Sequence, residues 1–173
     1  MRESVGIHSG RERGSRQPHR VVTMTTTFVP TDFDVPSSFQ GPGFHLEPLG
    51  PVHNERDHEA WMSSIDHIRS TPGMDWKKWP TPMTREQNLA DMEMHAGEFQ
   101  DRVGFTYSIL DGDEVIGCVY IYPSDKPDVD AHVRSWVRES RAEMDAVVWS
   151  SLSRWLVEEW PFQAIDYAPR PDA

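Results

Sequence analysis

The chain has 173 residues, of which 37% are hydrophobic and 10% aromatic, and this is the size and composition of one domain with one core. Its formal net charge of -11 at pH 7 opposes a general attraction to nucleic acids or to anionic membranes. No apolar run approaches the roughly 20 residues that span a bilayer, and the single cysteine, Cys118, excludes a disulfide framework and favours a cytoplasmic protein.

Residues 1–23 form a basic stretch, with five arginines against two glutamates and little apolar surface to bury. Such a segment cannot offset the entropy of its own ordering, and it lacks the apolar run of a signal peptide. We therefore expect residues 1–43 to comprise a disordered basic extension and an extended, proline-rich lead-in. Met24 is an alternative start of translation within this region.

Two helices are expected in the first half of the domain. Asn54 or Asp57 can cap the first, which runs to about Ile68 with apolar residues at helical spacing. Thr84 and Gln87 form a capping-box pattern that predicts the start of the second helix.

The centre of the chain predicts a hairpin, a further strand and a long helix. Residues 115–122 are β-branched, aromatic and small, which is typical of a strand buried on both faces. An Asp-Gly turn before them predicts a hairpin with residues 105–110, and residues 131–137 alternate as another strand would. A helix is expected to start at Ser140, which forms a capping box with Glu143. Shorter strands are expected at 44–49 and 162–167.

Three motifs in this order of elements resemble the GNAT N-acetyltransferase superfamily. Leu46-Glu47-Pro48-Leu49 is similar to the first strand of that family, and Gly117-Cys118-Val119-Tyr120-Ile121 is similar to the strand that precedes its acyl-CoA loop. Residues 137–146 resemble the loop itself, with Arg141 and Ala146 at matching positions. The family uses such a loop and the following helix start to bind a diphosphate.

The resemblance covers about residues 44–167 and implies an α/β (α+β) fold, in which a mixed, mostly antiparallel central sheet is flanked by helices. It implies one domain over residues 44–168 and a tail over 169–173, which is expected to be unordered. It also implies that two neighbouring strands separate just before Ser140, because that gap admits the pantetheine arm of the cofactor.

The activity implied by the resemblance is direct transfer of an acetyl group from acetyl-CoA to an amine of a small molecule or protein. An acidic cleft would suit a cationic acceptor. The backbone at Trp136 and Val137 would hold the thioester and pantetheine, and the loop would face the diphosphate. The implied cofactor-binding residues are Trp136, Val137, Ser140, Arg141, Ala142 and Ala146.

Three residues are considered for the general base of this reaction. They are Glu139, Asp130 and His132, in that order, and each is also explained as an ordinary surface residue. The usual late tyrosine of the family, which protonates the departing thiolate, has no clear counterpart, since Tyr167 belongs to the preceding strand.

Several residues favour a different class of function, a GNAT-like scaffold without activity that binds a ligand or protein and dimerises through its sheet edge. Ala142 and Met144 stand where the family has glycine, and Glu143 and Asp145 place carboxylates where a diphosphate would lie. The chain also ends before the helix and strand that usually follow in the family.

No metal site is expected, because the histidines and aspartates near the first helix do not share one helical face and no HExxH motif is present. Trp76 and Trp79, flanked by Lys77, Lys78 and Pro80, are the tryptophans expected to edge a cleft.

Overall fold

The structure is a computed structural model, and it describes residues 27–74, 78–171 and 173. The basic extension expected over residues 1–23, the alternative start at Met24, and Trp76 with Lys77 lie outside the described residues.

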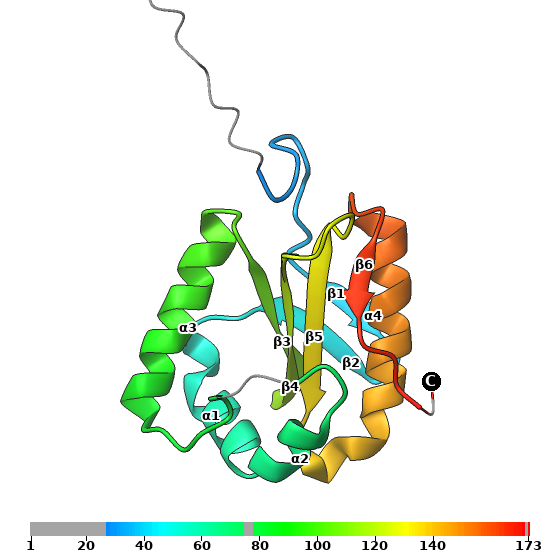
Figure 1. Cartoon of the computed structure of the whole chain (residues 1–173). Coiled ribbons are helices and arrows are strands. Elements are labelled where there is room, and N and C mark those ends of the chain that lie inside the picture. The colour runs from blue at the N-terminus through cyan, green and yellow to red at the C-terminus, as the bar shows by residue number, and fades with distance from the viewer. Residues whose placement is uncertain (1–26, 75–77, 172) are drawn as a thin grey trace, which may run out of the picture.

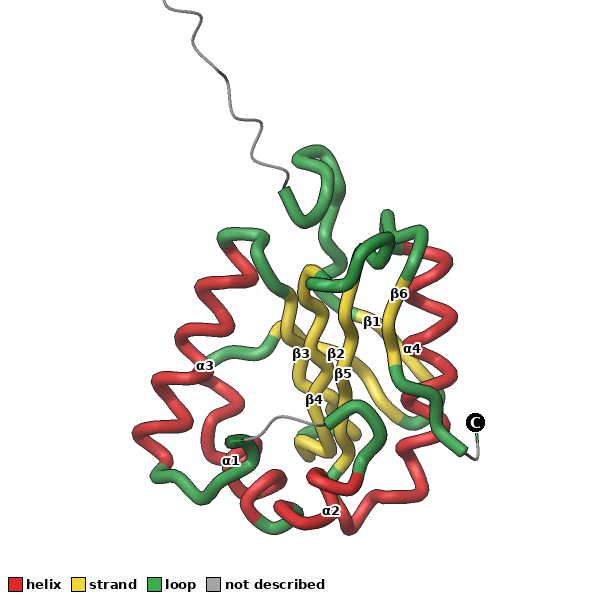
Figure 2. The backbone as a smooth tube through the Cα atoms, in the orientation of Figure 1, coloured by secondary structure: helices red, strands yellow, loops and turns green. Residues whose placement is uncertain are grey.

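A sheet of six strands, in the order β1-β2-β3-β4-β5-β6, runs through the centre of the described residues (Figure 1, Figure 2). Neighbours are antiparallel up to β5, whereas β5 and β6 form a parallel pair. This confirms the mixed, mostly antiparallel sheet. The strands are β1 (Phe39–Gly41), β2 (Phe44–Pro48), β3 (Phe105–Asp111), β4 (Glu114–Pro123), β5 (Ala131–Val137) and β6 (Ile165–Tyr167).

Helices cover both faces of this sheet, with α1 and α3 on one face and α4 on the other (Figure 1). None of the described helices is long and apolar enough to cross a membrane. The helices are the 3-10 helix η1 (Pro51–His53), α1 (Asn54–Met62), α2 (Ile65–Ser70), α3 (Arg85–Gln100), the 3-10 helix η2 (Glu139–Met144) and α4 (Asp145–Glu159).

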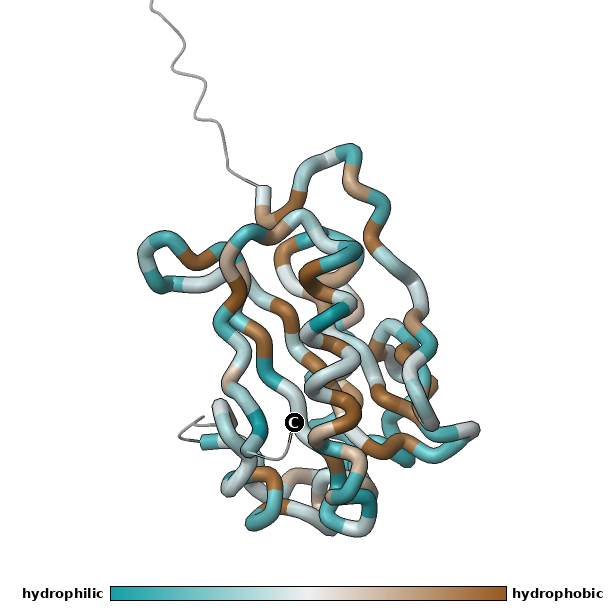
Figure 3. The backbone as a smooth tube through the Cα atoms, turned by 90° about the vertical axis from the view of Figure 1, so that its right-hand side faces the viewer, coloured by the Kyte–Doolittle hydropathy of each residue, from teal (hydrophilic) through white to brown (hydrophobic). Residues whose placement is uncertain are grey.

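Each face of the sheet has its own apolar core, because side chains alternate along the strands. Val133 of β5 packs towards Leu152 of α4, whereas Trp136 packs towards Trp61 of α1. Figure 3, viewed from the side of α4 and β6, shows hydrophobic and hydrophilic residues following one another along that helix. Cys118 is fully buried on the α1 face, as expected of a small apolar side chain.

The helix expected to end near Ile68 is broken into α1 and α2. The break lies beside Ser64, which is 2% exposed and accepts the N–H of Glu139 through its hydroxyl at 2.9 Å. Neither predicted residue caps α1: His53 precedes it, Asn54 is its first residue and Asp57 lies within it. The break between α1 and α2 thus coincides with a tertiary contact from Ser64 to the start of η2.

The prediction for the start of α3 is confirmed, whereas the prediction for the start of the long helix α4 is not. Thr84 caps α3 as predicted, since its hydroxyl accepts the N–H of Gln87 at 3.2 Å and the Gln87 side chain accepts the N–H of Thr84 at 2.8 Å. The prediction for Ser140 is wrong, because the chain first forms η2 after Arg138, and α4 begins only at Asp145. The sequence also does not predict β1, and β6 is shorter than the expected strand.

Candidate active site

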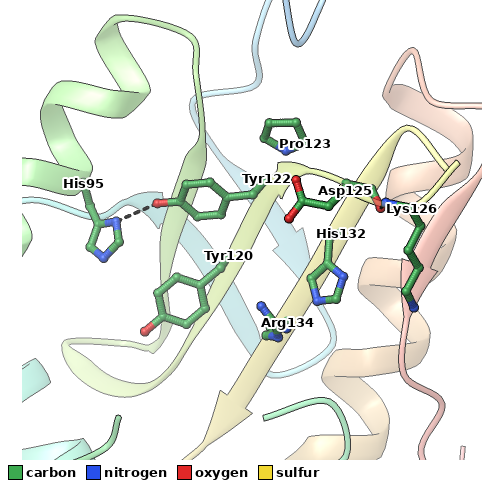
Figure 4. A pocket seen from close by; sticks show the side chains of 9 residues that line it. His95, Tyr120, Tyr122, Pro123, Asp125, Lys126, His132 and Arg134 are labelled. Carbon is green, nitrogen blue, oxygen red and sulfur yellow. Dashed lines mark hydrogen bonds between the residues drawn. The ribbon is translucent and has the colours of Figure 1, made fainter. Parts of the chain in front are cut away.

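A pocket of about 490 Å³ opens on the α3 side of the sheet, beside the end of β4 and the start of β5 (Figure 4). Asp125 is the single carboxylate among its described lining residues, which also include Lys126 and Arg134, so this pocket is not an acidic cleft of the kind that would suit a cationic acceptor. The lining residues are His95, Tyr120, Tyr122, Pro123, Ser124, Asp125, Lys126, His132 and Arg134.

His132 of β5 lines both this pocket and a smaller one of about 210 Å³ that borders β6. Its Nδ1 lies 3.0 Å from Oδ2 of Asp166, and the same oxygen accepts Nζ of Lys126 at 2.6 Å. Its Nε2 is buried and has no hydrogen-bond partner within the part of the chain that the structure describes. In the tautomer that carries its proton on Nδ1, beside this carboxylate, neutral His132 has its lone pair on Nε2.

The charges around His132 keep the ring neutral and its partner ionised. Burial, followed by the charge of Arg134, lowers the pKa of His132 below its ordinary 6.5. The hydrogen bond from Lys126 lowers the pKa of Asp166. A carboxylate that orients a neutral imidazole with an unpartnered Nε2 is an arrangement suited to general-base catalysis.

Tyr122 stands opposite His132 in the β4–β5 ladder. Its hydroxyl donates to Oε2 of Glu98 and lies 2.8 Å from Nδ1 of His95, as drawn in Figure 4. Burial and then the bond to Glu98 raise the pKa of Tyr122, so the phenol keeps its proton. The pocket lining thus includes a neutral imidazole and a protonated phenol on two paired residues of β4 and β5.

β5 and β6 pair over only three residues of each strand, after which the chain leaves β5 (Figure 1). Main-chain groups alternate sides along a strand. The N–H of Arg138 donates to the carbonyl of Ile116 on β4. The main-chain groups of Ser135 and Val137 therefore face away from β4, into this gap. The guanidinium of Arg170, after β6, lies in the gap and donates to the Ser135 carbonyl at 3.0 Å.

No protein-family model matches the chain, and no curated protein sequence matches it. The ribosomal-protein-S5-alanine acetyltransferase from Vibrio fischeri superposes with a TM-score of 0.54 at 14% identity, over 72% of this chain and 68% of that one. RimL, a ribosomal L7/L12 α-N-protein acetyltransferase, gives 0.52 at 14% identity, over 71% of this chain and 62% of its own. The microcin C7 self-immunity acetyltransferase MccE, solved with acetyl-CoA and AMP, gives 0.54 at 12% identity, over 72% and 67%. The chain has the GNAT N-acetyltransferase fold.

In a GNAT fold the gap beside β5 is the place implied for the pantetheine arm, and here the main-chain groups of Ser135 and Val137 that face the gap would suit such an arm once Arg170 had left. The carbonyl of Ser135 accepts a hydrogen bond from the Arg170 side chain rather than from a neighbouring strand, so this main-chain group is open to a donor other than a strand. Val137 presents its main chain to the same gap, whereas Trp136 faces β4 and donates its indole Nε1 to the hydroxyl of Tyr120 at 3.2 Å.

The diphosphate end of the GNAT cofactor site fits less well in this arrangement. At the start of η2 the N–H of Glu139 is bonded to Ser64 and that of Arg141 to the carbonyl of Arg138, both at 2.9 Å. The Arg141 guanidinium binds Oδ2 of Asp111 at 2.6 Å and a carboxylate oxygen of Glu114 at 2.7 Å. The Arg141 guanidinium and the N–H groups of Glu139 and Arg141 are therefore engaged with the chain itself.

The remaining loop residues lie at the start of η2 and α4. Ser140 and Ala142 are exposed on η2, and Ala146 is half-buried in α4. Met144 is half-buried and packs against the core on the α4 face, and Glu143 is exposed. Met144 thus turns inward rather than into the space outside the helix start.

The three candidate bases differ in their place along β5: Asp130 directly precedes the strand, His132 lies within it and Glu139 follows it. Oδ2 of Asp130 accepts the N–H groups of Gln163 and Ala164 at 2.6 and 2.9 Å, and these bonds lower the pKa of Asp130. Glu139 is exposed at the far end of the strand. Of the three, His132 alone lines the pocket.

The side chains of His53 and His58, near the first helix, have partners within the chain. His53 Nε2 lies 2.9 Å from Oε2 of Glu47, and His58 Nε2 lies 2.7 Å from the carbonyl of Met83. The described residues contain no group of three or more side chains placed to hold a metal ion.

Sequence reasoning missed Asp166, Lys126, Tyr122 and Arg170. Asp166 lies in a segment that was expected to be a strand, but its position opposite His132 follows from the β5–β6 register. No local signal in the sequence specifies that register. Arg170 lies in the tail expected to be unordered, yet it is 5% exposed and fully engaged.

Proposed function

We propose that this protein is an N-acyltransferase that moves an acetyl group from acetyl-CoA to an amine bound in the pocket of Figure 4. The observation that carries the proposal is the place of His132. His132 lines the pocket and also the smaller cavity beside β6, which is next to the gap between β5 and β6. Its Nε2 is buried and has no partner among the described residues. A base is required where an amine meets an acyl donor, since an ammonium group is not a nucleophile.

Acetyl-CoA, when bound, supplies an electrophilic acyl carbon and a thiol leaving group. His132 would accept the proton of the amine at Nε2, and Asp166 would hold the ring and balance the imidazolium that forms. The proton on His132 is then available to the departing thiolate, so no other acid is required for the balance of protons.

Ser135 and Val137 would hold the pantetheine arm through main-chain groups that face the gap. At the diphosphate end, Arg141 would exchange Asp111 and Glu114 for phosphate oxygens, which bind a guanidinium with the same geometry as carboxylates.

The test is release of free thiol from acetyl-CoA in the presence of a panel of amines, for the wild type, His132→Gln and His67→Gln. His67 lies on α2 and does not line the pocket, so it is the matched control. We expect His132→Gln to lower kcat/KM by about 10²- to 10⁴-fold and His67→Gln to leave it unchanged.

Wild-type activity in His132→Gln would overturn the assignment of the base. If the wild type neither releases thiol nor binds acetyl-CoA at millimolar concentration, the proposed function is wrong and a scaffold without activity is favoured instead.

A further inference from the structure

The segment after β6 folds back into the gap through one side chain. Nε of Arg170 lies 2.6 Å from Oδ2 of Asp145 on α4, and one terminal nitrogen lies 3.0 and 3.2 Å from O and Oγ of Ser135 on β5. The other terminal nitrogen donates to the carbonyls of Pro72 and Ala168 at 3.1 and 2.9 Å. The guanidinium thus joins β5, α4 and the loop after α2, and each of its nitrogens has an acceptor.

The acceptor on β5 is a main-chain carbonyl at a strand edge that no neighbouring strand covers in the described chain. An amide-bearing arm that lay along this edge would need the same carbonyl, and the buried guanidinium takes up the space beside it. The two occupants are therefore mutually exclusive.

We infer that Arg170 is a built-in plug of the acyl-donor gap, so that residues 168–171 leave β5 before an acyl donor binds. The inference rests on the proposed function, because the donor arm is what the plug excludes. It adds a regulated step to that function: the affinity for the donor is reduced by the fraction of molecules in which the gap is closed.

The contacts of Arg170 allow its release. Oγ of Ser135 lies 2.6 Å from the hydroxyl of Tyr167 and keeps that partner when the guanidinium leaves. The Asp145 side chain is 22% exposed, so water can solvate its carboxylate in place of Arg170. Oδ1 of Asp145 is buried and has no partner among the described residues, so the ion pair leaves one carboxylate oxygen unsatisfied.

If Arg170 is a plug, its removal should change the affinity for acetyl-CoA in the direction opposite to that expected from charge alone. Acetyl-CoA is an anion, so removing a cation from its binding site should weaken binding if charge alone mattered. If Arg170 blocks the gap, removing the guanidinium strengthens binding instead.

The experiment measures acetyl-CoA and pantetheine binding by calorimetry for the wild type, Arg170→Met and Arg154→Met. Arg154 is exposed on α4 and is the matched control for loss of one charge. We expect Arg170→Met to lower the Kd for acetyl-CoA by about tenfold or more, and the Kd for pantetheine in the same direction, while Arg154→Met leaves both unchanged. Pantetheine lacks the diphosphate and reports on the gap alone.

A second measurement uses the wild type only, in case Arg170→Met does not fold. Hydrogen exchange at the amides of Ala168 and Arg170 should rise on saturation with acetyl-CoA, while exchange at residues 134–137 of β5 should fall; Pro169 and Pro171 have no amide hydrogen to exchange. Equal affinities of wild type and Arg170→Met, or unchanged or slower exchange of the tail in the bound wild type, would overturn the plug and leave the transferase standing. Absence of acetyl-CoA binding in every protein would overturn the transferase and the plug together.

Discussion

His132 and Asp166 face each other across the parallel pair β5–β6, with Nδ1 of the imidazole 3.0 Å from Oδ2 of the carboxylate. Lys126 binds the same oxygen at 2.6 Å and lowers the pKa of Asp166, so the carboxylate stays ionised while it orients the ring. With the proton on Nδ1, the nitrogen of His132 that can accept a proton is Nε2, which has no partner among the described residues.

Activity should fall as the pH drops through the pKa of His132, because protonation removes the lone pair at Nε2. Burial and Arg134 lower this pKa, so the fall is expected below pH 6.5 in the wild type. Asp166 raises the pKa of His132 and Lys126 lowers it. Asp166→Asn should therefore move the acid limb of kcat/KM to lower pH and reduce its plateau by roughly 10²-fold, whereas Lys126→Met should move the limb to higher pH.

The measurement is kcat/KM against pH for the wild type and both variants. The opposite signs of the two shifts make each variant the control for the other. An acid limb that stays in place in both would show that a group other than His132 titrates.

Stability should depend on pH through Asp57, which is buried in α1 and 5% exposed. Burial raises the pKa of Asp57 from 3.8 to about 6, although Asn88 donates to Oδ2 at 3.1 Å. The folded chain then binds a proton more tightly than the unfolded chain, so this contribution to stability is lost as pH rises from about 4 through about 6. Asp57→Asn keeps the acceptor oxygen without the charge, and should stabilise the protein by about 1–3 kcal/mol at pH 7.5.

Urea unfolding at pH 5 and pH 7.5 measures this effect, with Asp91→Asn on the exposed side of α3 as the control. The gain from Asp57→Asn should be clearly smaller at pH 5. A gain of the same size at both pH values would mean that the effect is not electrostatic.

Two residues with the same capping pattern in sequence should differ in their effect on stability. Thr84→Ala removes the hydroxyl that accepts the N–H of Gln87 and should cost about 0.5–2 kcal/mol in the free energy of unfolding. Ser140→Ala, on exposed η2, removes no cap and should change it by less than about 0.5 kcal/mol. Chemical unfolding of the two variants tests this, and an equal cost would show that Ser140 caps a helix in solution.

Much of the fold follows from patterns within short segments. The Asp-Gly turn at residues 111–113, the alternation of residues 131–137 and the Thr84 cap each formed as predicted, since their causes are local. Gly117 is a residue that no local pattern explains. An added Cβ there would clash with the main-chain oxygen of Trp136, so the glycine is explained by the approach of β5 to β4.

The candidate site depends more than the fold does on contacts between residues that are far apart in the sequence. The sequence placed His132 on a strand and named it among the bases, but it ranked Glu139 and Asp130 ahead of it. Asp130 binds the main chain of the segment before β6 and Glu139 lies at the opposite end of β5, and neither relation is visible without the sheet register.

By itself, the sequence determined the order of the strands β2 to β6 and the helical segments between them, because helix caps, turns and hydrophobic periods act between residues close in the chain. Only the tertiary structure decided that Asp166 holds His132, that Arg141 binds Asp111 and Glu114, and that Arg170 enters the gap beside β5. The physical reason is that charged side chains pair by distance in space, and that distance is set by strand register and by where the chain turns back.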